Sequence, residues 1–319
     1  MGWAEAFDQL KTRIASRVEL LAAGATPRLL ATAVRGGRLL RVRRDHYALP
    51  GTPTSILQAV RIGGRIGCIS ALEGAGVFAF DKTCTHAHLD REASRTRHPN
   101  HRNRRLTAGE RDGVVVHWGE LLDRYDGSRW SVGTRDALAQ VLRCQHPWHA
   151  VASIDNALFL GVIGTAELAD IFAHVPGNLQ WLRELVDGRA EAGQETVLRM
   201  VLQEAGLHYE VQVSVAGVGR VDFVVEGCLV LEADSRLAHD GWDLHVRDRD
   251  RDIDLARLGY MSLRPAYQRT MFAPNDVREA VLHLLAVNRH LSALVRFVFV
   301  TPASLEQDEH RLPGLPGRR

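Results

Sequence analysis

The sequence predicts a mixed α/β protein, α+β overall, arranged as consecutive parts. Two patterns support this class: apolar residues recur at helical spacing in residues 7–35, and β-branched residues alternate with polar ones in residues 211–233. A chain of 319 residues with 45% hydrophobic and 24% charged residues is long enough for two or three domains. We expect parts at residues 1–52, 53–185 and 186–301, followed by a loose tail at 302–319.

Composition argues against several classes of protein. No stretch reaches the ~20 uninterrupted apolar residues of a membrane span, and the N-terminus lacks a signal-peptide core, so we expect a cytoplasmic protein with no membrane partner. Four cysteines without a C-x-x-C pair indicate reduced packing thiols rather than disulfides or a cysteine zinc site. They are Cys68, Cys84, Cys144 and Cys228. Because Lys11 and Lys82 are the only lysines, no later site can use one.

The first part is expected to be a helix-turn-helix unit with a wing. Apolar spacing predicts two helices in residues 7–23, with a break near residues 15–17. Thr26 and Pro27 predict the start of the next helix, because threonine caps free N–H groups and proline fits the first helical position. Its expected inward residues are Leu29, Leu30, Ala33 and Val34. Strands at 38–42 and 47–49 would complete the wing.

Such a unit would present its second helix to the DNA major groove and its wing to the backbone. Residues 1–50 hold nine Arg and Lys against four acids, a positive excess that suits phosphate contact. The expected DNA-binding residues are Arg28, Thr32, Arg35, Arg41, Arg43 and Arg44. A protein-docking winged helix is the alternative.

The stretch VELLAAGATPRLLATAVRGGRLLRVRRDHYALP resembles the N-terminal winged-helix domain of AbiEi-type antitoxins, over about fifty residues. The shared pattern is a helix, then "aaG", a short helix and "G-x-L-x-R-v-r-x-x-x-Y-a-l-P". In that family the domain binds DNA, often for autoregulation. The resemblance implies DNA as a partner and leaves a toxin or defence-system partner open.

Residues 53–185 are expected to form a connecting α/β region. The predicted helices are 55–61, 70–76, 134–142, 152–160 and 165–173, with a strand at 113–118. Residues 91–111 hold seven arginines and indicate a basic loop, either solvated or touching DNA. Histidines pair at 86/88, 98/101 and 146/149 without a cysteine or carboxylate at a familiar spacing, which argues against zinc. The region resembles, without sharp motifs, the connecting region of actinobacterial proteins that join an AbiEi-type winged helix to a nuclease-like domain.

The C-terminal part carries acids inside its best strand pattern. A helix with Glu195 in its first turn is followed by strands at 211–215, 220–225 and 228–233. Alternation places Asp222, Glu232 and Asp234 on one face if the hairpin loop has three residues, which we place at 225–227. That loop would pair Asp222 with Val230. Three converging carboxylates favour Mg²⁺ or Mn²⁺, while an exposed acidic strand edge is the alternative.

Further along, residues 243–258 predict a helix that Gly259 ends, a strand follows at 260–264, and a last helix covers 277–290. On the first of these helices Asp248, Arg251, Asp252 and Leu255 share one face. Ion pairs along a solvated helix are the simplest interpretation of its Arg-Asp run.

This constellation resembles the endonuclease-like domains related to very-short-patch-repair (Vsr) nucleases, within the PD-(D/E)XK superfamily, over about a hundred residues. The matching positions are Glu195, Ala205 to Leu207, Arg220 to Phe223, Leu229 to Asp234, His239, Asp248, Arg251, Asp252, Leu255, Gly259 and Arg264. The resemblance implies a restriction-endonuclease-like domain with a mixed central sheet flanked by helices. The chain departs from the pattern at Asp234, where the superfamily usually has lysine, and at Ser235, where the relatives usually have glycine.

The sequence therefore predicts a metal-dependent DNA endonuclease or nickase that hydrolyses phosphodiester bonds, in DNA repair or in defence against foreign or modified DNA. Asp222 and Glu232 would hold Mg²⁺ or Mn²⁺, and Asp234 would assist. Glu195 would bind a second ion or position water, and His239 would move protons. Arg251 would hold a DNA phosphate or pair with Asp248. The alternative is a DNA-binding transcriptional regulator or antitoxin with an inactive nuclease-like domain. A docking role in a defence system and a homodimer stay open.

Overall fold

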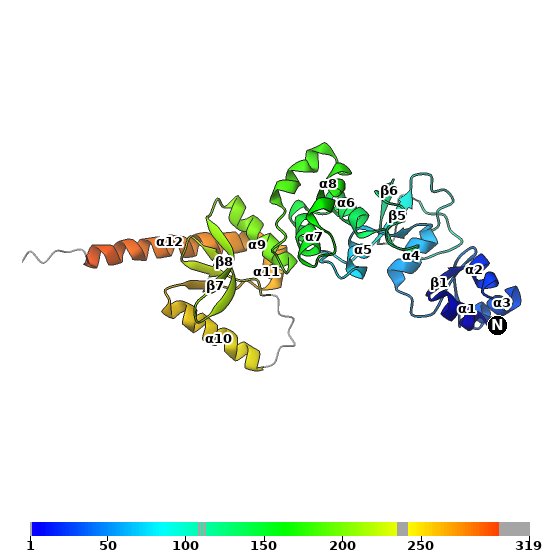
Figure 1. Cartoon of the computed structure of the whole chain (residues 1–319), viewed down its shortest axis with the longest axis horizontal. Coiled ribbons are helices and arrows are strands. Elements are labelled where there is room, and N and C mark those ends of the chain that lie inside the picture. Colours follow the sequence, from blue (N-terminus) through cyan, green and yellow to red (C-terminus); the bar gives the residue numbers. More distant parts are fainter. Residues whose placement is uncertain (1, 108, 110, 112, 235–241, 300–319) are drawn as a thin grey trace, which may run out of the picture. The chain divides into compact units, whose positions relative to one another are not determined.

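The computed structural model of this chain describes residues 2–107, 109, 111, 113–234 and 242–299. Side chains are described throughout these ranges except at residues 242–248 and 291–299. The chain divides into two compact units, Met1–Met200 and Val201–Arg319 (Figure 1). Among the described residues, helices surround three sheets, which confirms the mixed α/β class. The finer division at residues 52 and 185 stays a prediction.

The first unit begins with the elements α1 (Trp3–Leu10), β1 (Ile14–Ser16), α2 (Arg17–Ala22), α3 (Pro27–Arg35), β2 (Leu40–Arg43) and β3 (His46–Ala48). The strands form an antiparallel sheet in the order β1-β3-β2. The expected break between the first two helices is the strand β1, whose Ile14 and Ala15 are buried. Directly after it, Ser16 and Glu19 cap α2, since each side chain accepts from the other residue's backbone N–H.

The helix α3 begins and ends where the sequence predicts. The backbone N–H of Leu29 donates to the Thr26 hydroxyl at 3.3 Å, and Leu30 and Ala33 are buried as expected. The prediction for Leu29 is wrong, because its residue surface is 41% exposed. Leu29 lies at the edge of the buried face of α3, about 100° around the helix from Leu30.

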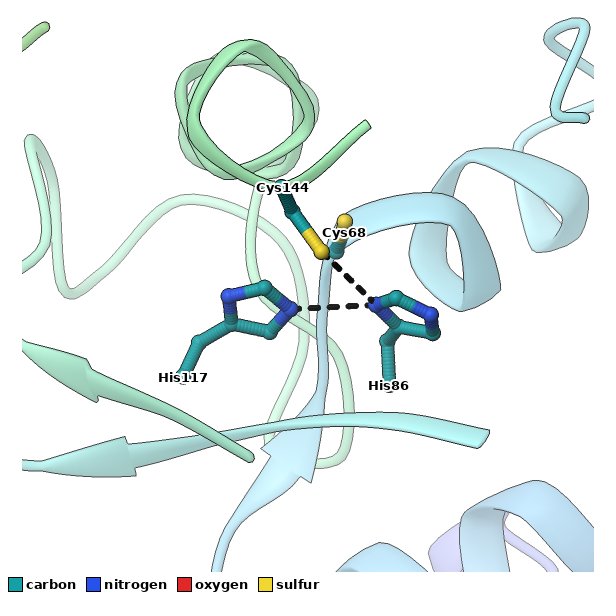
Figure 2. Close-up of side chains that lie close together, drawn as sticks. All are labelled: Cys68, His86, His117 and Cys144. Atoms are coloured by element: carbon teal, nitrogen blue, oxygen red, sulfur yellow. Dashed lines mark hydrogen bonds between the residues drawn. The ribbon is translucent and has the colours of Figure 1, made fainter. Parts of the chain in front are cut away.

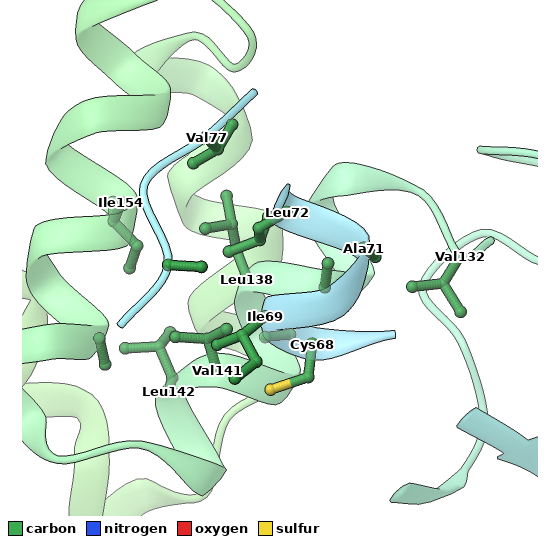
Figure 3. Close-up of a cluster of buried hydrophobic side chains, with 14 of the residues drawn as sticks. Cys68, Ile69, Ala71, Leu72, Val77, Val132, Leu138, Val141, Leu142 and Ile154 are labelled. Carbon is green, nitrogen blue, oxygen red and sulfur yellow. The ribbon is translucent and has the colours of Figure 1, made fainter. Parts of the chain in front are cut away.

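The rest of the first unit is a helical layer beside a short sheet. Its elements are α4 (Thr54–Ile62), β4 (Arg65–Ile66), α5 (Cys68–Gly74), β5 (Thr85–Asp90), β6 (Val114–Gly119), α6 (Thr134–Cys144), α7 (Pro147–Phe159), α8 (Thr165–Ala173) and the 3₁₀ segment η1 (Gly177–Leu185). In the sheet, β5 pairs antiparallel with β4 and parallel with β6. Figure 3 shows the core, where Ile69 and Leu72 of α5 pack against Leu138 and Val141 of α6.

Part of the predicted basic loop, residues 97–105, makes hydrogen bonds to α4 and within itself. Gln58 of α4 donates to the Asn100 side chain at 3.1 Å, and an isolated bridge joins Arg97 to Arg105. Arg61 also donates to the carbonyl of Pro99. These contacts tie residues 97–105 to α4 and to each other.

A buried ion pair joins α7 to α9 (Gly193–Glu204). The Arg199 guanidinium donates to the Asp155 carboxylate and to the carbonyl of Leu185, both at 2.7 Å. Thr196 and the backbone N–H of Asp187 donate to the same carboxylate, at 2.8 and 2.7 Å. Burial raises the pKa of Asp155, while Arg199 favours its charged form. The Asp155 side chain is fully buried, so its charge depends on these donors.

The second unit is built on a mixed four-stranded sheet, as predicted. Its elements are β7 (Tyr209–Val215), β8 (Gly219–Val225), β9 (Leu229–Leu231), α10 (Trp242–Arg257), β10 (Met261–Leu263), α11 (Tyr267–Phe272) and α12 (Pro274–Phe299). The order is β10-β9-β8-β7, with β9 and β10 parallel and the other pairs antiparallel. Leu255 of α10 packs with Val224 and Val230, so α10 covers the face of the sheet on which these two valines lie.

The hairpin between β8 and β9 has three loop residues, but their placement corrects the prediction. Val225 pairs with Leu229, so the loop is residues 226–228 rather than 225–227. Glu226 and Gly227 both take positive φ angles, 49° and 67°, which starts the turn at Glu226. Val225 consequently stays in the ladder. Val230 pairs with Val224, not with Asp222 as expected.

None of the helices in the described part of the chain is both long enough and apolar enough to cross a membrane.

Candidate functional site

Five of the predicted DNA-binding side chains in the first unit are exposed, namely Arg28, Thr32, Arg35, Arg41 and Arg44. The first three lie on α3 at positions i, i+4 and i+7, which places them on one face of the helix. Arg43 is different, because it is half-buried and donates to the carbonyl of Arg95 at 3.2 Å. Its guanidinium lies against Gly63, where a Cβ atom would collide with it. Arg43 therefore contacts the basic loop, and part of its side chain stays exposed.

In the second unit, Asp222 of β8 and Glu232, which follows β9, share one face of the sheet. Phe223 pairs with Leu231, so the next position of the ladder sets Asp222 opposite Glu232. The Asp222 carboxylate accepts the backbone N–H of Ala233 at 2.8 Å. The corrected loop keeps the two acids together, because a shift of two residues in register preserves the face of each side chain.

Arginines surround Glu232. Its Oε1 accepts from Arg251 of α10 at 3.0 Å, and its Oε2 forms a 2.6 Å ion pair with Arg264, which follows β10. Arg264 also forms an ion pair with Asp252 at 3.1 Å. We call Asp222, Glu232, Arg251, Asp252 and Arg264 the Glu232 cluster. With every member charged, it carries one net negative charge.

Burial raises the pKa of Glu232, and Asp222 and Asp252 act in the same direction, whereas Arg264 and Arg251 favour the charged form. The Glu232 side chain is 12% exposed, and those of Arg264 and Arg251 are 19% and 29% exposed. Part of each arginine side chain is thus open to solvent, although Nε of both arginines and Nη2 of Arg264 are buried. Guanidinium groups bind carboxylates and phosphates with the same planar set of donors. Arg251 and Arg264 can therefore bind a phosphate in place of the Glu232 carboxylate.

Of the remaining predicted site residues, Glu195 and Asp234 are described with other contacts, and the side chains of two others lie outside the described residues. Glu195 is buried at the start of α9, where its carboxylate accepts the backbone N–H groups of Ala192 and Glu191 at 3.0 and 3.2 Å. Asp234 is exposed and lies in an isolated bridge with Ala266. His239 and the side chain of Asp248 lie outside the described residues. The described partners of Arg251 are Glu232 and the carbonyl of Arg220.

A second cluster lies in the first unit, where the residue spacing argued against a zinc site. Cys68 at the start of α5, His86 of β5, His117 of β6 and Cys144 at the end of α6 turn their ligand atoms toward one point (Figure 2). These four atoms all lie within 4.8 Å of one another. In the described part of the chain, this is the one group of three or more Cys, His, Asp or Glu with that property. We call it the Cys/His cluster.

Both cysteines are free, as the interpretation as reduced thiols requires, but they lie beside each other and beside two histidines. His86 Nδ1 lies 3.0 Å from His117 Nε2 and 3.9 Å from Cys144 Sγ. Burial raises the pKa of the Cys68 thiol. Its hydrogen bond to Cys144, with those of His117 and His86, lowers the pKa of the Cys144 thiol.

The signal for this cluster was present but scattered. His86 and His88 were expected on one face of a strand, and His117 falls in the predicted strand 113–118. The parallel pairing of β5 with β6 sets His117 beside His88 and diagonal to His86. The two cysteines lie at helix ends that are 76 residues apart, so they form no short sequence motif that would predict a shared site.

A comparison of the chain with protein-family models finds no match, and a comparison with curated proteins finds none that is significant, so both resemblances stay predictions.

Proposed function

We propose that this chain is a DNA-binding protein that hydrolyses phosphodiester bonds in DNA, as an endonuclease or nickase. One observation carries the proposal: Asp222 on β8 and Glu232 just after β9 share one face of the sheet, and two arginines pair with Glu232. Acids can hold a metal ion and guanidinium groups can bind a phosphate, so the two together suit phosphodiester cleavage.

The donor set fits a magnesium ion. Magnesium is held in proteins by one or two carboxylates together with substrate phosphates rather than by a full protein cage, and Asp222 and Glu232 supply that number. When bound, the ion would neutralise phosphate charge and lower the pKa of a water molecule.

The chain's own groups have distinct tasks in this proposal. Arg251 and Arg264 would leave Glu232 for the oxygens of the DNA phosphate, which would free the Glu232 carboxylate. Asp222 would keep its position through the backbone N–H of Ala233. The exposed basic face of α3 and the wing would bind the DNA backbone, so affinity should fall steeply with salt.

The test is nicking of supercoiled plasmid in Mg²⁺ or Mn²⁺. Asp222→Asn and Glu232→Gln keep the shape of each side chain and remove its charge, so each should slow nicking by roughly 10²-fold or more. Asp250→Asn, which changes an exposed acid on α10, is the matched control and should nick at the wild-type rate. Wild-type nicking by both site variants would refute the assignment.

A second candidate is a DNA-binding regulator whose nuclease-like domain is inactive. The pairing of Glu232 with two arginines favours it, since these pairs already neutralise the acid without a cation. This candidate predicts salt-dependent DNA binding that Arg28→Ala and Arg35→Ala weaken, with no nicking of any substrate.

A further inference from the structure

We propose that Cys68, His86, His117 and Cys144 bind one zinc ion, which fastens α5, β5, β6 and α6 of the first unit together. The proposal goes beyond the proposed function and does not depend on it. The four residues come from four elements that are distant in sequence, and their side chains converge (Figure 2).

The spacing of the ligand atoms suits a tetrahedral ion. With zinc bonds of about 2.3 Å to sulfur and about 2.0 to 2.1 Å to nitrogen, the edges of the tetrahedron are about 3.3 to 3.8 Å long. The observed separations are 3.0 Å between the two imidazole nitrogens and 3.9 Å between Cys144 Sγ and His86 Nδ1. An ion at the centre therefore needs only small side-chain shifts.

The chemistry of the ligands selects zinc over the magnesium of the proposed nuclease site. Two thiolates and two neutral imidazoles give a neutral complex with a divalent cation. Soft sulfur ligands disfavour magnesium, and a tetrahedral set of two sulfurs and two nitrogens is typical of zinc. Four protein ligands leave no open position for water, so the ion would have a structural role.

The backbone at Cys68 is a separate observation that points to this site. Cys68 is fully buried and has a φ of 49°, a left-handed conformation that is unfavourable for a residue other than glycine. Such strain persists where the surroundings hold it and often marks a functional position. The conformation places the Cys68 thiol within reach of the other three ligand atoms.

The Gln140 side chain contacts segments that carry residues of the Cys/His cluster. It lies one helical turn before Cys144 on α6, and its Oε1 accepts the backbone N–H of Cys68 at 2.9 Å. Its Nε2 lies 3.1 Å from Nδ1 of His88, the strand neighbour of His117. One amide thus fixes the positions of two ligand-bearing segments, as outer groups do around metal sites.

The first test is metal analysis of the full chain, produced with added zinc and purified in reducing buffer without chelator. We expect about one zinc per chain in the wild type. Cys144→Ser and His117→Gln should each lower the content to about a tenth or less. Cys84→Ser and His101→Gln are matched controls from the same unit, outside the cluster, and should keep the wild-type content.

A second test uses the wild type alone, in case the variants fail to fold. Cys144 is exposed, so a mere packing thiol there should react with an alkylating reagent at once. If zinc is bound, Cys144 should react slowly until a strong chelator is added, and re-added zinc should restore protection. Peptide mass spectrometry identifies the modified residue.

Two results would overturn the proposal. One is a wild type that contains no zinc, takes up none when it is added, and shows equal Cys144 alkylation with and without chelator. The other is a freshly purified chain with Cys68 and Cys144 joined as a disulfide, since the cluster would then hold a covalent bond in place of an ion.

Discussion

The Glu232 cluster and the Cys/His cluster both gather polar groups that are costly to bury, but they differ in what balances them. The Glu232 cluster includes its own counter-charges, since Arg251 and Arg264 bind the acid directly. The Cys/His cluster consists of metal-ligand atoms, with two thiols and two imidazoles around one point. The comparison teaches that acids in a strand pattern can have arginine partners in the fold, so the pattern by itself does not identify a metal site.

The difference follows from the residues that each fold brings in. Arg264 lies just after β10, which pairs in parallel with β9. This strand pairing places the Arg264 guanidinium beside Glu232. In the first unit, the histidines lie on β5 and β6, and the cysteines lie at the start of α5 and the end of α6. We therefore expect the two clusters to respond differently to chelation, charge removal and acid.

The largest expected effect is that of zinc removal. A structural zinc site contributes its binding free energy to folding, on the order of 10 kcal/mol in small zinc domains. Chelation should therefore lower the Tm of the first unit by roughly 10 °C or more. The measurement is calorimetry with and without chelator, followed by zinc readdition. An unchanged melting curve would mean that the Cys/His cluster needs no ion.

The next effect concerns the buried pair of Asp155 and Arg199. Asp155→Ala leaves the Arg199 guanidinium, 5% exposed, without its carboxylate, which should cost about 3 to 5 kcal/mol of unfolding free energy. Denaturant unfolding of the variant measures it. Asp187→Ala is a control at the neighbouring acid, which is more exposed and pairs with Arg189 at the surface. Equal losses in both variants would contradict the role of burial.

A smaller effect is expected from acid. Burial lowers the pKa of His149 from 6.5 to about 4, and the charge of His146 acts in the same direction. The unfolded chain takes up this proton near pH 6.5, whereas the folded chain takes it up only near pH 4, so stability should fall as the pH falls through this window. The loss should reach about 2 kcal/mol, after allowance for partial exposure.

His149→Gln removes the titrating group, and its unfolding free energy should change less between pH 7 and pH 5 than that of the wild type. Any release of zinc by acid affects both proteins and cancels in the difference. Parallel pH profiles for the two proteins would show that His149 takes up its proton equally in both states.

The smallest effect is expected at Glu232. Glu232→Ala removes one acid, but Arg264 keeps its ion pair with Asp252, and Arg251 keeps its hydrogen bond to the carbonyl of Arg220. The cost in unfolding free energy should be about 1 to 2 kcal/mol, below that of Asp155→Ala. Denaturant unfolding of both variants compares the two clusters directly. A larger loss at Glu232 would mean that its ion pairs are essential to the second unit.

Local patterns predicted most helices and the hairpin of the second unit, because periodicity and capping act over a few residues. The start of α3 at Pro27 and the helix end at Gly259 are examples. Short strands such as β1 and β4 were missed, since their residues are strand-forming only through pairing with distant partners. The predicted loop was misplaced by one residue because the turn begins at Glu226, whose carboxylate also accepts the N–H of His208.

The candidate sites divide in the same way. The placement of Asp222 and Glu232 on a common face could be predicted, because side chains alternate between the two faces along a strand. The arginine partners of Glu232 and the meeting of Cys68 with Cys144 depend on how separate elements pack, which spacing does not encode. Tertiary contacts thus decide which polar groups have arginine partners and which metal-ligand atoms lie close together.

The most direct test of the account is plasmid nicking by Asp222→Asn with its zinc content measured in the same preparation. The account predicts that the variant keeps about one zinc per chain and loses nicking by roughly 10²-fold. Nicking at the wild-type rate, or loss of zinc together with nicking, would contradict the separation of a structural ion in the first unit from hydrolysis in the second.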